Sequence, residues 1–170
     1  MTMTEKLKIA VIGAGTMGRG IVQLFAQAGH RVHCFDSFEG AADKAVEFVA
    51  GMIGRGVAKG RIDADEFERI RGQTHAAATM QDLADCDVLI EAIVEDLEAK
   101  RALSRSLEAI VSPQAIPASN TSSLVVAEIA AACAHPQRVA GLHFFNPVPL
   151  MKVAGGIAAR GTAPEVGTPL

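Results

Sequence analysis

The chain has 170 residues, of which 49% are hydrophobic and 21% are charged, the composition of an ordinary soluble globular domain. Its formal net charge is −3 and its basic residues are spread along the chain in ones and twos, which argues against a nucleic-acid partner. No apolar run reaches the length of a membrane span, and residues 1–6 lack the apolar core of a secretory signal. These properties predict one cytoplasmic domain with no nucleic-acid or membrane partner.

The three cysteines, Cys34, Cys86 and Cys133, are widely spaced and form no CxxC pair. An odd number at such spacing argues against a disulfide framework and against a zinc site. We therefore expect reduced, buried thiols and no bound metal.

The first three elements of the chain predict one βαβ unit. Residues 8–12 form a short apolar run that ends at a glycine, which is typical of a strand buried on both faces of a parallel sheet. Apolar residues then recur at a spacing of three to four as far as Gly29, which predicts a helix that ends there. Residues 31–36 follow as a second strand, with Asp36 at its carboxyl end.

Strands and helices alternate along the rest of the chain. We expect a helix whose apolar face spans 46–57, a helix after Asp63, a strand at 87–90, a helix after Asp96, a strand at 115–119, a helix at 123–132 and a strand at 138–143. This alternation predicts an α/β fold with a doubly wound, mostly parallel sheet, whose ligands bind beyond the carboxyl ends of the strands. Residues 153–170 are rich in glycine, alanine and proline and predict an irregular tail after a Rossmann-like domain over residues 1–152.

A glycine-rich loop joins the first strand to the first helix. Gly13, Gly15 and Gly18 have the spacing GxGxxG, which lets the backbone approach a dinucleotide diphosphate at the positive end of a helix dipole. Thr16 and Met17 lie between the last two glycines and belong to the same predicted cofactor site. The alternative is a glycine-rich turn without a ligand.

Asp36 lies 18 residues after Gly18, at the end of the second predicted strand. A carboxylate there accepts hydrogen bonds from both hydroxyls of the adenosine ribose and repels a 2′-phosphate. No arginine follows directly to receive that phosphate, so the sequence favours NAD over NADP. The alternative role of Asp36 is that of a cap or turn residue.

Two polar residues near strand ends are candidates for proton chemistry. His143 precedes the run FFNPVP, and an imidazole with a pKa near 6.5 can take a proton from a secondary alcohol and return it. A strand histidine can also be purely structural. Ser122, in the run SNTSS, could donate a hydrogen bond to an alcohol or carbonyl oxygen, and a helix cap explains it equally well.

Four segments together resemble the NAD-binding domain of the 3-hydroxyacyl-CoA dehydrogenases. They are GAGTMG at 13–18, EAIVE at 91–95, ASNTSS at 118–123 and GLHFFNPVPLMK at 141–152, and their order and spacing match. The resemblance runs from about Leu7 to Lys152. It implies an oxidoreductase that uses NAD to oxidise the 3-hydroxyl of an acyl-CoA thioester to a ketone, as in fatty-acid β-oxidation, with His143 as the general base.

The same resemblance implies further site residues. Glu95, Lys100, Ser122 and Asn146 would surround the nicotinamide end of the cofactor, and Ser122 would also touch the substrate oxygen. Lys59 stands where the family has a basic contact to CoA, although a solvated lysine is an equally good explanation.

The chain departs from the family at two points. Family members continue after Met-Lys with a strand whose glutamate orients the histidine, whereas this chain has Gly155 at that place. The family's helical C-terminal domain, which supplies most of the dimer interface, is absent from these 170 residues, so the oligomeric state stays open. Two alternatives therefore remain: a catalytically weak NAD-binding module, and a dehydrogenase of the same family that acts on a free hydroxy acid.

Overall fold

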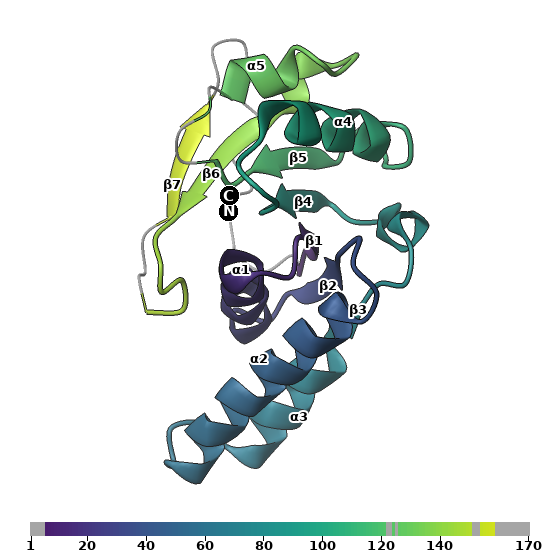
Figure 1. Cartoon of the computed structure of the whole chain (residues 1–170). Coiled ribbons are helices and arrows are strands. Elements are labelled where there is room, and N and C mark those ends of the chain that lie inside the picture. Colours follow the sequence, from purple (N-terminus) through teal and green to yellow (C-terminus); the bar gives the residue numbers. More distant parts are fainter. Residues whose placement is uncertain (1–5, 122–123, 125, 151–153, 159–170) are drawn as a thin grey trace.

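The computed structural model describes residues 6–121, 124, 126–150 and 154–158, the last five by their backbone alone. Its strands form one seven-stranded sheet in the order β3-β2-β1-β4-β5-β6-β7 (Figure 1). The first six strands are parallel, and β7 runs antiparallel to β6. The strands are β1 (Lys8–Ile12), β2 (Arg31–Phe35), β3 (Thr74–Ala76), β4 (Val88–Glu91), β5 (Ile116–Ser119), β6 (Ala140–Phe144) and β7 (Ala154–Ala158). The doubly wound, Rossmann-like sheet expected from the sequence is confirmed.

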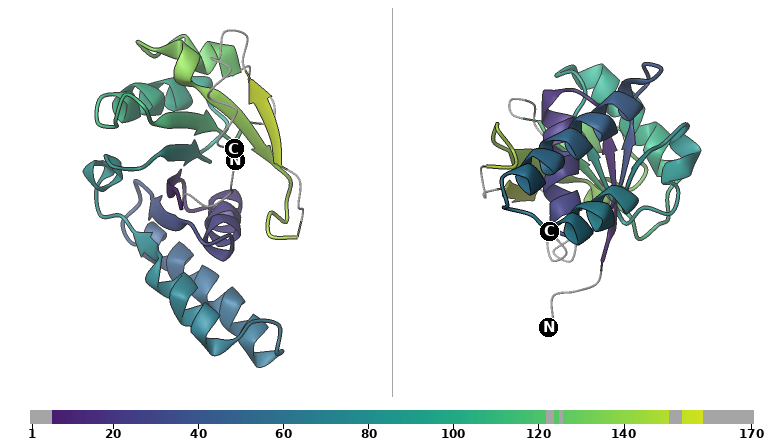
Figure 2. Two further views of the ribbon diagram at one scale, coloured as in Figure 1. Left: turned by 180° about the vertical axis from the view of Figure 1, so that it is seen from behind. Right: turned by 90° about the horizontal axis from the view of Figure 1, so that it is seen from below.

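Helices cover both faces of this sheet. The helices are α1 (Thr16–Gln27), α2 (Ala41–Ala58), α3 (Ala64–Gly72), α4 (Leu97–Glu108) and α5 (Val126–Ala130), with 3-10 turns η1 (Met80–Leu83) and η2 (Pro136–Arg138). Side chains of α1 and α2 join one core cluster, and those of α4 and η1 join the cluster on the other face. The hairpin of α2 and α3 projects away from the sheet (Figures 1 and 2). Among the described residues, no helix has both the length and the apolarity needed to cross a membrane.

The first strand shows why the apolar runs are continuous. Ile9 and Val11 pack into the cluster on the α1 side, while Ala10 and Ile12 pack into the cluster on the α4 side. Successive side chains of a strand point to opposite faces, so a strand covered on both sides needs apolar residues at every position.

The polar residues expected to begin two helices do so. The carboxylate of Asp63 accepts a hydrogen bond from the Glu66 amide at 2.7 Å, and that of Asp96 accepts one from the Ala99 amide at 2.8 Å. Each bond satisfies one of the amide donors that a helix leaves unpaired in its first turn.

The cysteines are free thiols, as expected. Cys34 and Cys86 are buried, and desolvation raises the pKa of each thiol to about 12. Cys133 is only partly buried.

Three features differ from the sequence-based expectations. Residues 154–158 form a strand and not an irregular tail; residues 159–170 lie outside the described part. β7 is regular because its backbone pairs with β6, from Ala140 opposite Ala158 to Phe144 opposite Ala154. A glycine-rich segment can make this backbone pairing without an apolar pattern of side chains. β3 was not expected, because three residues at the sheet edge carry too little pattern. The helix expected at 123–132 spans only Val126–Ala130 within the described residues.

Candidate functional site

The carboxyl ends of β1, β4 and β5 meet at one edge of the sheet. The strand order reverses between β1 and β4, and doubly wound folds bind ligands in the crevice at such a point. The glycine loop follows β1, and β4 ends at Glu91 beside it. The structure therefore brings residues that are about 80 positions apart in the sequence to one crevice.

The missing side chains of the three loop glycines leave space for three different things. Gly13 has φ +107°, and a Cβ there would lie 2.5 Å from the carbonyl oxygen of Ala92. A Cβ on Gly18 would lie 1.6 Å from the carbonyl oxygen of Gly13, so α1 can pack against the loop only because this residue lacks one. A Cβ on Gly15 would meet nothing within 4 Å, which leaves open space in front of the first residue of α1. A diphosphate fits that space, where the helix amides point outward.

Asp36 lies directly beside this loop. Its carboxylate accepts hydrogen bonds from the amide of Ala14 at 2.7 Å and from the amide of Phe38 at 2.9 Å. The residue also lines a cavity of about 220 Å³ with Gly13, Ile12, Phe35, Ser37, Met80, Ile93 and Leu103. Asp36 thus shapes the turn and also faces a partly apolar cavity of the kind that holds an adenosine.

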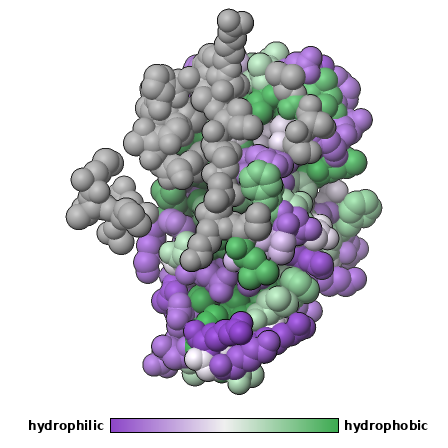
Figure 3. Space-filling view, turned by 90° about the vertical axis from the view of Figure 1, so that its left-hand side faces the viewer, coloured by the Kyte–Doolittle hydropathy of each residue, from purple (hydrophilic) through white to green (hydrophobic). Residues whose placement is uncertain are grey.

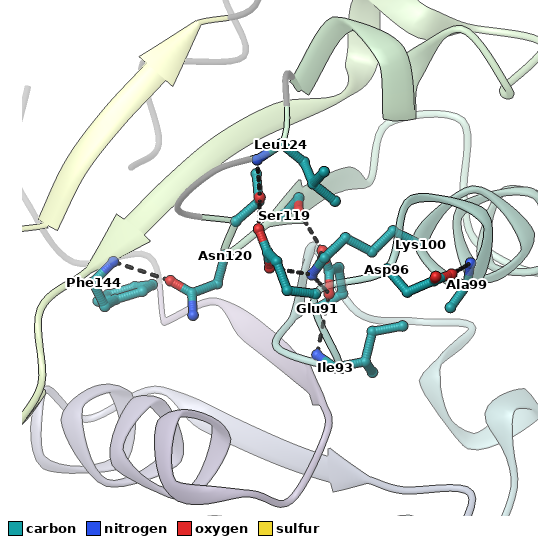
Figure 4. Close-up of polar contacts among 11 residues, drawn as sticks. Glu91, Ile93, Asp96, Ala99, Lys100, Ser119, Asn120, Leu124 and Phe144 are labelled. Carbon is teal, nitrogen blue, oxygen red and sulfur yellow. Dashed lines mark hydrogen bonds and ion pairs between the residues drawn. The ribbon is translucent and has the colours of Figure 1, made fainter.

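A buried ion pair occupies the other side of the crevice (Figure 4). The ammonium of Lys100 on α4 has no solvent exposure and donates to both carboxylate oxygens of Glu91, at 2.8 and 2.9 Å. The hydroxyl of Ser119 on β5 donates to the same carboxylate, which also accepts the amide of Ile93 at 3.2 Å. A buried charge pair is tolerated only when its remaining hydrogen-bonding capacity is satisfied, and these partners do so.

Glu95 connects this pair to the surface of the crevice. It lies 3.4 Å from the Lys100 ammonium, its side chain is 35% exposed, and it accepts a hydrogen bond from the hydroxyl of Thr121. Two carboxylates and one ammonium leave this cluster with a formal charge of −1. Glu91 begins the EAIVE segment quoted from the sequence, but no site role was predicted for it, although an acid at the end of a buried strand was a signal for one.

His143 projects from β6 at the same edge of the sheet. Its ring packs edge-on against Phe145, with the ring centroids 4.9 Å apart. Its Nδ1 atom is buried and has no hydrogen-bond partner among the described residues. The neighbouring backbone is held by Asn120, whose side-chain oxygen accepts the amide of Phe144 at 3.1 Å (Figure 4).

The remaining residues expected at the site fall into four groups. Thr16 and Asn146 line one cavity of about 290 Å³. Met17 is partly buried and packs against the core cluster. Lys59 is exposed in the turn after α2, at the end of the helical hairpin that points away from the sheet (Figure 1). Ser122 lies outside the described residues.

The shape and charge of the crevice fit a dinucleotide. The open space at Gly15 has room for a diphosphate, and the cavity at Asp36 has the largely apolar walls that suit an adenosine. The charged cluster of Glu91, Lys100 and Glu95 would then lie at the nicotinamide end.

Comparison with known proteins gives a consistent result. Residues 8–168 match the family described as 3-hydroxyacyl-CoA dehydrogenase, NAD binding domain. The chain is 40% identical over 157 residues to a 3-hydroxybutyryl-CoA dehydrogenase of Clostridioides difficile, covering 92% of this chain and 56% of that protein. It is 39% identical over 158 residues to the 3-hydroxyadipyl-CoA dehydrogenase of Escherichia coli K12, covering 93% and 33%.

A solved structure agrees with these relatives. The crystal structure of a 3-hydroxybutyryl-CoA dehydrogenase from Escherichia coli K12 superimposes with a TM-score of 0.92 at 38% identity, covering 96% of this chain and 34% of that one. The chain thus spans between about a third and somewhat over half of the length of these relatives. It belongs to the 3-hydroxyacyl-CoA dehydrogenase family of oxidoreductases, as that family's NAD-binding domain, and its cofactor is NAD.

Proposed function

We propose that the chain is the cofactor half of an NAD-dependent 3-hydroxyacyl-CoA dehydrogenase, with His143 as the general base. The observation that carries this proposal is the unpartnered Nδ1 of His143 at the edge of the sheet where the dinucleotide-binding loop lies. A structural histidine in a folded interior has its polar atoms satisfied, whereas a proton-transfer residue needs a nitrogen available for another group.

The mechanism follows from the chain's own residues. His143 takes the proton from the 3-hydroxyl of the substrate, and Ser122 donates a hydrogen bond to the same oxygen. NAD, when bound, supplies the hydride acceptor. Glu95 and Asn146 hold the nicotinamide end, and the buried Lys100 positions Glu95 there through their ion pair. Asp36 binds the ribose and selects NAD over NADP. Lys59 at the end of the hairpin contacts the CoA.

Gly155 limits the rate of this chemistry. The backbone register places it directly opposite His143 in an antiparallel pair, and side chains at two such positions share one face of the sheet. A carboxylate at position 155 would lie beside the imidazole, fix its tautomer and stabilise its protonated form. Because glycine supplies none of this, we expect NAD binding with slow proton transfer.

The test measures oxidation of 3-hydroxybutyryl-CoA by the chain and by its Gly155→Glu variant, each with and without a separately supplied helical half of a relative. Gly155→Glu should raise turnover in the presence of that half. Gly155→Gln is the matched control, because it adds a side chain of similar size at the position opposite His143 without the negative charge. Turnover by the unaltered chain alone at about 10 per second or more would contradict the expectation that Gly155 makes proton transfer slow.

A second candidate function is an NAD-binding module without turnover. The glycine opposite His143 favours it, because the base lacks an orienting acid. Calorimetric NAD binding together with no turnover by Gly155→Glu, even with the helical half present, would support this module over the dehydrogenase.

The substrate is proposed from the relatives, which are named for 3-hydroxybutyryl-CoA and 3-hydroxyadipyl-CoA. Both are acyl-CoA thioesters of short chain length, and a free hydroxy acid is the alternative. We place the chain in the cytoplasm, since its free, largely buried thiols suit a reducing compartment.

A further inference from the structure

Arg19 is an arginine without an acidic partner. It lies one turn into α1, and its guanidinium carbon stands 4.1 Å from the ring centroid of Phe48 on α2. Among the described residues, no carboxylate or carbonyl pairs with this guanidinium, whereas Arg101 and Arg71 each pair with a glutamate. A guanidinium stacked on a ring is held in place while the N–H groups at its edge remain free to bind an oxyanion.

This guanidinium lines the cavity of about 290 Å³ that also contains Asn146. Met52, Val148, Pro149 and Leu150 give the cavity mainly apolar walls. A Cβ on Gly20 would lie 3.1 Å from the Val148 Cβ, so α1 approaches this loop closely and its position is well defined. Figure 3 views the molecule from this side and shows apolar surface, in green, between polar residues, in purple, in the lower half of the view.

We propose that Arg19 binds a carboxylate at the far end of the substrate's acyl chain, so that the preferred substrates are CoA thioesters of dicarboxylic acids. This inference rests on the proposed function, because it takes the reacting carbon to lie near His143. Asn146 follows His143 by three residues and lines the same cavity as Arg19, so this cavity adjoins the turn that follows the proposed base.

The size of the cavity decides which anion of an acyl-CoA reaches Arg19. A volume of about 290 Å³ is at the small end of ligand sites, which suits a few methylene groups and one carboxylate. The phosphates of CoA are separated from the thioester by the whole pantetheine arm, which does not fit beside the reacting carbon in this volume. The apolar walls match the methylene groups, and a guanidinium binds a carboxylate in bidentate fashion.

The test compares two five-carbon thioesters, glutaryl-CoA and valeryl-CoA, which differ in one terminal carboxylate. Each is titrated by calorimetry into the full chain saturated with NADH. The unaltered chain should bind glutaryl-CoA about tenfold more tightly than valeryl-CoA, the usual worth of a charge-assisted hydrogen bond. Arg19→Gln should reduce this ratio to about one, and Arg19→Lys should keep part of it. Arg55→Gln, which removes an exposed charge of α2 outside the cavity, should leave the ratio unchanged.

Three outcomes would overturn the inference. Equal affinities for the two thioesters in the unaltered chain would show that no carboxylate site exists, while the proposed dehydrogenase function would stand. A loss of NAD affinity in Arg19→Gln, measured in a separate titration, would assign the guanidinium to the cofactor diphosphate. Binding of NADH with no binding of either thioester would remove the carboxylate site and the proposed acyl-CoA function together.

Discussion

The two sides of the crevice are built in different ways. The adenosine side, at β1 and β2, where we propose that the adenosine binds, is formed by backbone: Gly13, Gly15 and Gly18 make the loop, and the carboxylate of Asp36 accepts the Ala14 amide. The nicotinamide side, at β4 to β6, where we propose that the nicotinamide binds, consists of buried charges and hydroxyls that come from different elements (Figure 4).

This difference determines how each side can fail. The adenosine side depends on close approach of backbone atoms, so an added methyl group damages it. The nicotinamide side depends on charge balance in a dry interior, so the loss of one partner leaves another charge buried without compensation.

The largest effect is expected from Lys100→Met. The variant keeps a similar volume but leaves the carboxylate of Glu91 buried without its cation, and the free energy of unfolding should fall by about 3 to 5 kcal/mol. Urea denaturation measures the loss. The double variant Glu91→Gln/Lys100→Met should recover part of it, because it removes both charges. A loss below about 1 kcal/mol in the single variant would mean that Glu91 is not held as a buried anion.

The next effect tests the adenosine side through Gly18→Ala. Its methyl group would fall 1.6 Å from a backbone oxygen, so the free energy of unfolding should drop by about 3 kcal/mol, the upper end for overpacking. Gly15→Ala is the matched control, because its methyl group meets nothing within 4 Å. We expect Gly15→Ala to change the unfolding energy by less than about 1 kcal/mol and to weaken NAD binding. Equal destabilisation by both changes would contradict this division of roles.

Asp36→Ala should have a smaller effect, seen in cofactor affinity. Loss of a charge-assisted hydrogen bond to the ribose should weaken NAD binding by about 1.5 kcal/mol in calorimetry. Asp36→Asn removes the charge but keeps an oxygen that can accept a hydrogen bond from one neighbouring amide. Comparing the NAD affinities of the two variants therefore separates the effect of the charge from the effect of the turn. If the unaltered chain binds NADP as tightly as NAD, Asp36 is a turn residue alone.

The smallest effect concerns acid sensitivity on the adenosine side. Burial, then the neighbouring His75 and Arg31, lower the pKa of His33 from 6.5. The folded chain therefore holds this proton less tightly than the unfolded chain does. Neutral His33 thus contributes fully to the free energy of unfolding above about pH 6.5, and this contribution is lost as the pH falls below that value. His33→Asn should flatten the loss of stability with falling pH in that range. The exposed His135→Asn serves as the control, and the same flattening there would contradict the assignment.

Much of the fold and one side of the site could be predicted because the signals are local. A strand covered on both faces needs apolar residues in succession, and the loop needs its glycines at fixed spacing, so β1, α1, β2 and the Gly13 to Gly18 turn are visible in consecutive residues. Asp63 and Asp96 were visible for the same reason, since a helix cap acts on an amide three residues away.

The sequence by itself therefore determined the βαβ unit, the alternation of strands and helices and the family of the chain. Only the tertiary structure decided which charges meet: that Lys100 is buried against Glu91 and Ser119, that β7 pairs with β6 and places Gly155 opposite His143, and that Arg19 stacks on Phe48. The physical reason is that these contacts join separate elements. Their partners are set by sheet register and helix packing, and neither leaves a periodic trace in the sequence.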